Sequence, residues 1–199
     1  MRAHTLALSL AGAFVLSACS SLNPFSSEGK PPALKPLASP VKMNEGWRAR
    51  VDDAGVFVFQ PAISGGAVFA TGKDGEVTRI ESGRTVWKTP LKTRVSGGVG
   101  SDGSLVAVGT PKGEVIALDA ESGQVKWRVF INAEVLAAPA VSGGMVVVRS
   151  ADSRLFGLDA SDGKRRWTYQ RATPALALRN AAGVVMEGNF IIAGYPGGK

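Results

Sequence analysis

The chain has 199 residues, with 23 Lys and Arg against 16 Asp and Glu, and its formal net charge is +7. The charges are scattered, which is typical of a solvated surface and argues against nucleic-acid binding; the alternative is a preference for an acidic partner or anionic head groups. The single histidine, His4, and the single cysteine, Cys19, lie near the start, so the rest of the chain has no residues for His-based acid–base catalysis, a cysteine nucleophile, a disulfide or a zinc site with N and S ligands.

Residues 1–18 have the layout of a secretory signal peptide. A short start with Arg2 is followed by an apolar stretch over residues 6–16, and small residues precede Cys19. The apolar stretch is too short for a permanent membrane-spanning helix. Residues 16–19 resemble the bacterial lipobox, which implies that Cys19 becomes the lipidated first residue of the mature protein. The alternative is an ordinary signal peptide with a coincidental cysteine.

The segment that follows is expected to act as a tether. Residues 19–41 are rich in serine and contain five prolines, a composition that neither pairs as a central strand nor buries a core. Ser20 follows the cysteine, and the lipoprotein sorting rule then implies the outer membrane. We therefore expect a lipid-anchored protein at the periplasmic face of the outer membrane, with its globular part, residues 42–199, held near that membrane.

The tryptophans define an internal repeat. Trp47, Trp87, Trp127 and Trp167 are the chain's only tryptophans, and each follows the previous one by 40 residues. A period of about 40 residues that is rich in short β-type runs is the signature of a β-propeller in which each repeat is one four-stranded blade. The sequence thus predicts an all-β fold of four-stranded antiparallel blades.

Turn residues mark the strands inside the repeats. Gly, Asp and Ser separate short apolar runs, as tight hairpins require. The expected strands are residues 136–141, 145–149, 154–159 and 164–169 in the third interval, 105–109 and 114–119 in the second, and 67–71 and 76–80 in the first.

The array is expected to be incomplete. Trp47 is assigned to a fourth strand that has no earlier strands before it, residues 190–194 to a second strand, and residues 198–199 to the opening of a third. We expect three full blades and two partial ones, with the remaining partners supplied by a longer chain.

Two copies of a motif resemble the repeat of quinoprotein-type propellers. Segments 117–127 and 157–167 are similar to the pattern Ala-x-Asp-x-x-Thr-Gly-Lys-x-x-Trp, although Ser122 and Asp162 replace the threonine. The resemblance implies that each indole docks against the neighbouring blade and is structural; the alternative is a cage of tryptophans around a ligand. Asp119 and Asp159 are expected to fix hairpin turns through their own backbone, and the alternative is a metal or catalytic role.

One repeat is longer than the others. Trp127 precedes Gly143 by 16 residues, whereas Trp167 precedes the matching Gly188 by 21. The five extra residues fall within 171–186, in a connector expected on the same face as the turns between second and third strands. An insertion in a regular scaffold often carries function.

The inserted segment, the lipobox and the propeller together resemble the BamB family of outer-membrane β-barrel assembly lipoproteins. That resemblance implies a full ring of eight blades and a Pro-x-Leu-x-Leu-Arg segment that contacts the POTRA region of BamA. Carried over by position, the contact residues are Leu176, Leu178 and Arg179. The alternative is that the two leucines line the buried face of a strand. Asn180 replaces the glycine that commonly follows the arginine, and an acidic contact segment is implied beyond Lys199.

The expected function is a non-enzymatic scaffold of the barrel-assembly (BAM) complex, with no cofactor and no metal. Its partners by resemblance are BamA, other members of the complex and nascent outer-membrane proteins. The first alternative is a quinoprotein dehydrogenase that holds pyrroloquinoline quinone and Ca²⁺ on the propeller axis, although the cysteine pair typical of such enzymes is not present in these 199 residues. The second is another lipoprotein propeller that binds a different component of the cell envelope.

Overall fold

The computed structural model describes residues 44–171 and 182–195, and within these ranges the chain forms strands, turns and loops without a helix. Chain contacts place Glu45–Lys199 in one compact unit. The described part of that unit contains three four-stranded antiparallel sheets and one two-stranded sheet, each with its strands in sequence order. These are three complete blades and part of a fourth, so the fold is an incomplete β-propeller, as predicted.

The strand bounds follow the 40-residue repeat. Blade 1 contains β1 (Ala62–Ser64), β2 (Ala67–Thr71), β3 (Glu76–Glu81) and β4 (Arg84–Pro90). Blade 2 contains β5 (Gly100–Ser101), β6 (Leu105–Gly109), β7 (Glu114–Asp119) and β8 (Val125–Phe130). Blade 3 contains β9 (Ala140–Ser142), β10 (Met145–Arg149), β11 (Leu155–Asp159) and β12 (Arg165–Tyr169), and the partial blade contains β13 (Val184–Glu187) and β14 (Phe190–Ala193).

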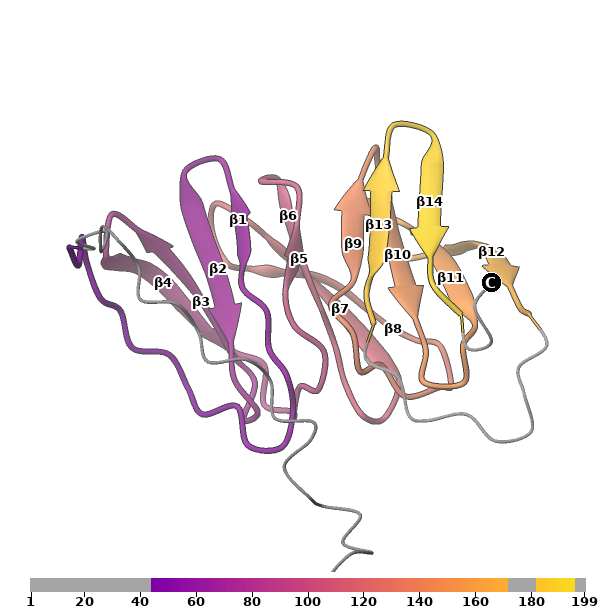
Figure 1. Cartoon of the computed structure of the whole chain (residues 1–199), viewed down its shortest axis with the longest axis horizontal. Helices are drawn as coiled ribbons and strands as arrows, with labels where there is room; N and C mark the ends of the chain where they lie inside the picture. The colour runs from indigo at the N-terminus through magenta and orange to yellow at the C-terminus, as the bar shows by residue number, and fades with distance from the viewer. Residues whose placement is uncertain (1–43, 172–181, 196–199) are drawn as a thin grey trace, which may run out of the picture. The chain divides into compact units, whose positions relative to one another are not determined.

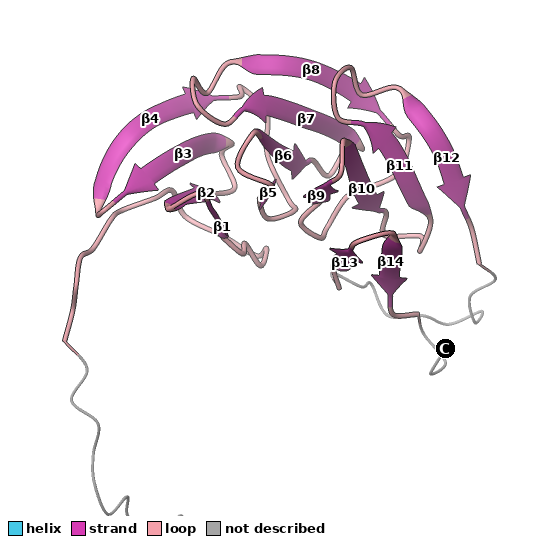
Figure 2. Ribbon diagram, turned by 90° about the horizontal axis from the view of Figure 1, so that it is seen from above, coloured by secondary structure: helices cyan, strands magenta, loops and turns pink. Residues whose placement is uncertain are grey.

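The blades of this unit stand side by side (Figure 1), and seen from above they follow a curve (Figure 2). Figure 2 shows β1, β5, β9 and β13 on the inner side and β4, β8 and β12 on the outer side. The tryptophan-bearing strands are therefore the outer ones. This placement spreads the indoles along the outer rim, as the propeller interpretation predicts, and gives them no common centre in which to enclose a ligand.

Two hydrophobic layers join the three complete blades. The middle strands of blade 2 have a neighbouring blade packed against each face. Side chains of a strand alternate between its two faces, so both sets are buried. Val106 and Ile116 pack in the layer shared with blade 1, whereas Ala107 and Val115 pack in the layer shared with blade 3. β6 and β7 consequently consist of nearly continuous buried residues rather than alternating ones.

The indoles fasten each outer strand to the next blade. Trp87 Nε1 donates to the carbonyl oxygen of Ala120 at 3.1 Å, and Trp127 Nε1 donates to that of Ala160 at 2.9 Å. The prediction that the tryptophans dock against the neighbouring blade is confirmed for these two. Trp47 lies against Gly83 at the corresponding turn of blade 1, and half of its surface is exposed.

Two expected strands differ from the observed structure by more than one residue at an end. The run 136–141 was expected to be one strand, but β9 is Ala140–Ser142, because residues 135–137 are buried in a connector rather than paired along a ladder. The expected strand at Trp47 is not formed either, since residues 44–61 contain no strand in the described chain. Its three partners were expected from a longer chain, so the assignment stays a prediction. No strand of the described residues pairs with that segment, and an isolated extended segment has no ladder to stabilise it.

Candidate functional site

The connectors between blades have two lengths. Residues 91–99 join blade 1 to blade 2, residues 131–139 join blade 2 to blade 3, and both connectors have nine residues. Residues 170–183, here called the long connector, join β12 to β13 and number fourteen. The five extra residues predicted from the tryptophan spacing are therefore confirmed, and they belong to a single connector of the described blades.

The short connectors lie tightly over the sheets. The amides of Ser96 and Gly97 donate to the carbonyl oxygen of Gly109 at 3.1 and 3.3 Å, and Ser96 Oγ donates to that of Val135 at 2.5 Å. A Cβ on Gly97 would stand 2.4 Å from the carbonyl oxygen of Ala137. Successive short connectors thus pack on one another with no space for added atoms.

The connectors also lie on the expected face. The amide of Val95 donates to the carbonyl oxygen of Lys73, and the amide of Val135 donates to that of Thr110. Lys73 and Thr110 belong to the turns between the second and third strands of blades 1 and 2. The prediction that connectors and these turns share one face is confirmed for the two short connectors.

The predicted contact residues fall inside the long connector. Leu176, Leu178 and Arg179 belong to residues 172–181, which lie outside the described residues, and so does the predicted lipidation site, Cys19. The structure does describe both ends of the connector. Arg171 precedes the segment and Ala182 follows it.

Side chains of two blades meet at these ends. Arg149, the last residue of β10, donates from Nη1 to the carbonyl oxygen of Ala182 at 3.4 Å, and its guanidinium lies 5.2 Å from the ring centre of Tyr195. The Arg171 guanidinium lies 5.9 Å from the same ring, and Tyr169 meets Tyr195 edge to face with ring centres 6.3 Å apart. Both distances from a guanidinium to the ring are within the range of cation–π attraction.

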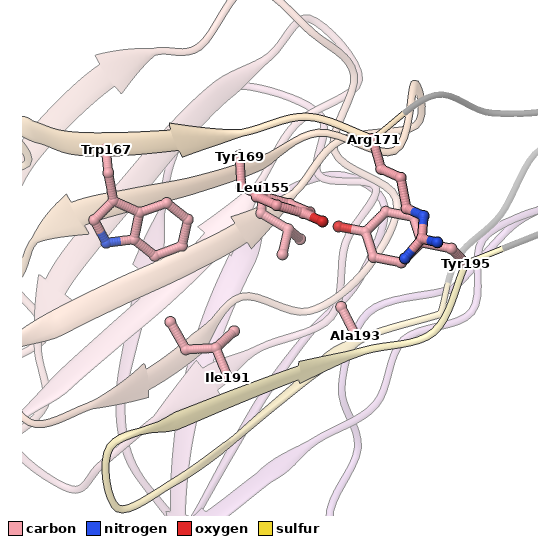
Figure 3. Close-up of a pocket in the computed structure, with 7 residues that line it drawn as sticks. All are labelled: Leu155, Trp167, Tyr169, Arg171, Ile191, Ala193 and Tyr195. Carbon is pink, nitrogen blue, oxygen red and sulfur yellow. The ribbon is translucent and has the colours of Figure 1, made fainter. Parts of the chain in front are cut away.

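A cavity of about 460 Å³ opens beside these rings, between β12 and β14 (Figure 3). Its walls are mostly apolar and aromatic. In Figure 3 the Arg171 guanidinium covers the Tyr195 ring, and Ile191 and Ala193 form the opposite wall on the hairpin. The lining residues are Leu155, Trp167, Tyr169, Arg171, Ile191, Ala193 and Tyr195.

Burial dominates the electrostatics at this position. It raises the pKa of the Tyr195 phenol above its usual value, and the two nearby arginines oppose that shift. Arg149 is 2% exposed, yet its Nε and Nη2, like Tyr195 Oη, find no hydrogen-bond acceptor among the described residues. Neither Arg149 nor Tyr195 was predicted from the sequence. Aligning the repeats could have indicated Arg149, because their second strands end at Thr71, Gly109 and Arg149.

The two aspartates of the repeat motif serve the turns. Asp119 Oδ1 accepts hydrogen bonds from the amide and hydroxyl of Ser122, both at 2.8 Å, and Asp159 Oδ1 accepts the corresponding pair from Ser161 at 2.8 and 2.6 Å. Arg166 Nη2 lies 2.6 Å from Asp159 Oδ2. The hydrogen bond from the Ser161 hydroxyl is the largest cause that lowers the pKa of Asp159. The prediction that these residues fix hairpin turns is confirmed.

Two features are absent from the described residues. Residues 44–171 and 182–195 form no helix long and apolar enough to cross a membrane. In the same ranges, no three His, Cys, Asp or Glu side chains gather closely enough to hold a metal ion.

Comparison with known sequences points to one family. The family model described as "Outer membrane protein assembly factor BamB" matches residues 73–199. The protein of that name from Bordetella pertussis is 40% identical over 200 residues, a match that covers 100% of this chain and 52% of the relative. The one from Nitrosomonas eutropha is 40% identical over 169 residues, covering 84% of this chain and 40% of the relative. The chain thus spans about half the length of the curated relatives it matches.

Solved structures give the same fold. The crystal structure of BamB from Moraxella catarrhalis matches 64% of this chain and 39% of its own, with 30% identity and a TM-score of 0.60. The computationally designed Ika4 protein matches 79% of this chain and 96% of its own with a TM-score of 0.62, and at 16% identity it supports the fold alone.

Proposed function

Because the chain belongs to the BamB family of outer membrane protein assembly factors, we propose that it is a non-enzymatic scaffold that binds the POTRA region of BamA through its long connector. In this role it holds its partner within the barrel-assembly complex and assists the assembly of outer-membrane proteins. The propeller supplies a rigid frame, and the connector supplies the contact residues.

The observation that carries the proposal is the length of one connector in an otherwise regular array. Two connectors of nine residues are packed tightly between blades, and the third has fourteen. In these two connectors residues 95–99 and 135–137 are buried, and several of their backbone amides are hydrogen-bonded, so this part offers little to a partner. Extra residues added to the same framework are free to take up a binding role, as is common for insertions in repeat folds.

The sequence of the inserted segment suits a small protein contact. Leu176 and Leu178 supply apolar groups that can enter a groove, and Arg179 supplies a guanidinium that pairs with a carboxylate in a fixed two-pronged geometry. Interfaces draw most of their energy from a few such anchors. We propose that these three side chains are the anchors of the BamA contact.

The anchor to the membrane belongs to the same proposal. We propose that Cys19 carries lipid and holds the protein at the periplasmic face of the outer membrane. Several acyl chains on one cysteine suffice for stable attachment, since each buried methylene contributes about 0.8 kcal/mol and one chain alone gives only marginal binding. The tether then leaves the propeller close to the periplasmic part of its partner.

The test is a binding measurement on the full-length protein with Leu176, Leu178 and Arg179 all changed to alanine. We expect its affinity for the purified POTRA region to fall roughly 30-fold, the equivalent of about 2 kcal/mol. A matched control changes Val86, Val125 and Arg165 to alanine, because these are likewise two apolar residues and an arginine, exposed on the outer strands. The control is expected to bind as the parent does, and an unchanged affinity of the folded first variant would contradict the proposal.

A further inference from the structure

The outer strands of the three complete blades carry charge of one sign. β4, β8 and β12 each contain two cationic residues and no Asp or Glu. The cations are exposed, and they are Arg84, Lys88, Lys126, Arg128, Arg165 and Arg166. Because these strands form the outer side of the curve in Figure 2, the six side chains make a band along it, here called the basic rim.

Half of these cations are paired inside their own blade. The pairs are Lys88 with Glu76, Arg128 with Glu114 and Arg166 with Asp159, with N–O distances of 2.6, 3.3 and 2.6 Å. The other cation of each strand, Arg84, Lys126 or Arg165, forms no salt bridge with a described residue. Each blade therefore presents one cation outside any salt bridge.

Charge on these strands has one use that needs no partner. In the described chain, β4, β8 and β12 are sheet edges that pair on one side only, and charged side chains on an edge hinder pairing with another chain. Acidic side chains can serve that purpose too, whereas all six charges of the basic rim are positive. The uniform sign indicates a second role, the attraction of an anionic partner.

Apolar side chains are exposed on the same strands. Val86 and Val125 are accessible, and Phe130, the last residue of β8, is 65% exposed. A cavity of about 340 Å³ opens between β8 and β12 at this point, and its lining includes Phe130, Lys164 and Arg165. Cations beside exposed apolar groups suit the surface of an anionic bilayer, where head groups attract the cations and the apolar groups enter the boundary region.

The spacing of the unpaired cations favours a lipid surface over a protein partner. Arg84, Lys126 and Arg165 lie on three different blades. A protein interface draws most of its binding energy from a compact cluster of buried anchors, whereas the charges of the basic rim are spread along the molecule. An anionic bilayer presents many charges over a wide plane, and each cation held near that plane contributes to binding.

We propose that the basic rim binds anionic phospholipid head groups, chiefly through Lys126 and Arg165 on the adjacent blades 2 and 3. This contact orients the propeller with these outer strands toward the bilayer. It does not replace a lipid anchor, because attraction by a few cations is weak and is screened by salt. The inference goes beyond the proposed function and requires neither a lipid on Cys19 nor a contact with BamA.

The test is a vesicle-binding measurement on the full-length protein without residues 1–19, so that no acyl chain contributes. The vesicles contain phosphatidylcholine with about one third phosphatidylglycerol, and phosphatidylcholine alone is the neutral reference. We expect the parent to bind the anionic vesicles and not the neutral ones. Lys126→Gln combined with Arg165→Gln, here called the rim variant, should bind roughly 20-fold more weakly, since each cation near such a surface contributes about fivefold.

A matched control removes the same charge from another face. Arg94→Gln combined with Lys112→Gln also removes one arginine and one lysine, both exposed, from connector 91–99 and from the turn between β6 and β7. Its binding should stay within about twofold of the parent, because salt screens charges over about 10 Å. An equal loss in the control and the rim variant would show attraction by net charge alone and would overturn the proposal.

Three other results would also overturn it. They are failure of the parent to bind anionic vesicles, equal binding of the parent to both kinds of vesicle, and unchanged binding by the folded rim variant. If the parent ignores vesicles but binds soluble polyglutamate through Lys126 and Arg165, the basic rim serves an acidic protein and the lipid proposal fails.

Affinity for the POTRA region is measured separately on the same variants. The rim variant is expected to keep it, because its two changes lie on outer strands and not in the long connector. Loss of vesicle binding with normal POTRA binding separates the two surfaces. Failure of the lipid proposal therefore leaves the proposed function standing, and the reverse holds as well.

Discussion

The indole N–H of Trp127 lies 2.9 Å from the carbonyl oxygen of Ala160, a residue of the next blade. The same ring packs against Gly163, where an added Cβ would stand 2.7 Å from the indole. One side chain thus contributes a hydrogen bond and a fitted apolar contact between blades. This pairing explains why tryptophan recurs every 40 residues, since phenylalanine and leucine provide the contact but not the donor.

Replacing Trp127 with phenylalanine is expected to destabilise the fold. The change leaves the carbonyl oxygen of Ala160 without its hydrogen-bond donor in a largely buried contact. Leaving such a group unpaired typically costs about 1–3 kcal/mol. Trp127 is 7% exposed and Trp47 is 49% exposed, so Trp47→Phe should cost less than about 0.5 kcal/mol. Urea unfolding of the full-length protein measures both, and equal losses would show that the bond between blades is unimportant.

Gly123→Ala is expected to be more damaging than Gly143→Ala. Both glycines have a positive φ, 72° and 57°, which strains any other residue. At Gly123 the new methyl would also stand 2.7 Å from the Trp87 ring, whereas nothing lies within 4 Å of it at Gly143. We expect a loss of about 1 kcal/mol at Gly143 and a clearly larger one, at least about 2 kcal/mol, at Gly123. Thermal unfolding of the two variants checks the order, and similar losses would refute close docking of Trp87.

Asp159→Asn is expected to lower stability near pH 7 and to matter less in acid. The pKa of Asp159 is lowered by the Ser161 hydroxyl, the Ser161 amide and Arg166, in that order. A carboxyl group with a lowered folded-state pKa stabilises the fold above its unfolded pKa of about 4, and this contribution is lost as pH falls below that value. Denaturation of parent and variant at a series of pH values should therefore give curves that converge in acid. Stability curves of parent and variant that stay parallel in acid would contradict a lowered pKa of Asp159. Arg166→Met, which removes one of the charged partners, should reproduce part of the loss of stability near pH 7.

Cys19→Ala is expected to release the protein from the membrane. On the proposed lipidation of Cys19, the variant lacks the thiol that would carry the lipid, and with it the acyl chains that would bury in the membrane. The variant should move from the detergent-soluble membrane fraction to the soluble periplasmic fraction, while Ser21→Ala, a neighbouring change that spares the thiol, should stay with the membrane. Retention of Cys19→Ala in the membrane fraction would mean that another segment anchors the chain.

The strands that the sequence predicts best are those framed by turn residues on both sides. The bounds expected for 105–109 and 145–149 agree with β6 and β10, because Gly and Asp at each end leave little freedom in where the hairpins turn. The inner strand expected at 136–141 was too long. Apolar periodicity cannot separate a buried connector residue such as Val135 from a buried strand residue, since both lie in the same hydrophobic layer.

The candidate site, like the strands, could be predicted from the sequence only in part. The five-residue insertion was predictable, since the tryptophan spacing serves as an internal standard. The roles proposed for Leu176, Leu178 and Arg179 remain predictions, because they lie outside the described residues. The contact between Arg149 and Tyr195 joins residues 46 positions apart, and no periodic pattern indicates such a pair. It requires the fold to bring the end of β10 beside the chain that follows β14.

The direction of the indole bonds has a consequence for biosynthesis. Trp87 and Trp127 each donate to a residue 33 positions later in the chain, so an outer strand gains its fastening only when the following repeat has been made. A chain that emerges N-terminus first, as it does from the export channel that the predicted signal peptide implies, therefore completes each blade only after the next repeat has emerged. Until that repeat emerges, the newest indole has neither its acceptor nor the turn glycine against which it packs.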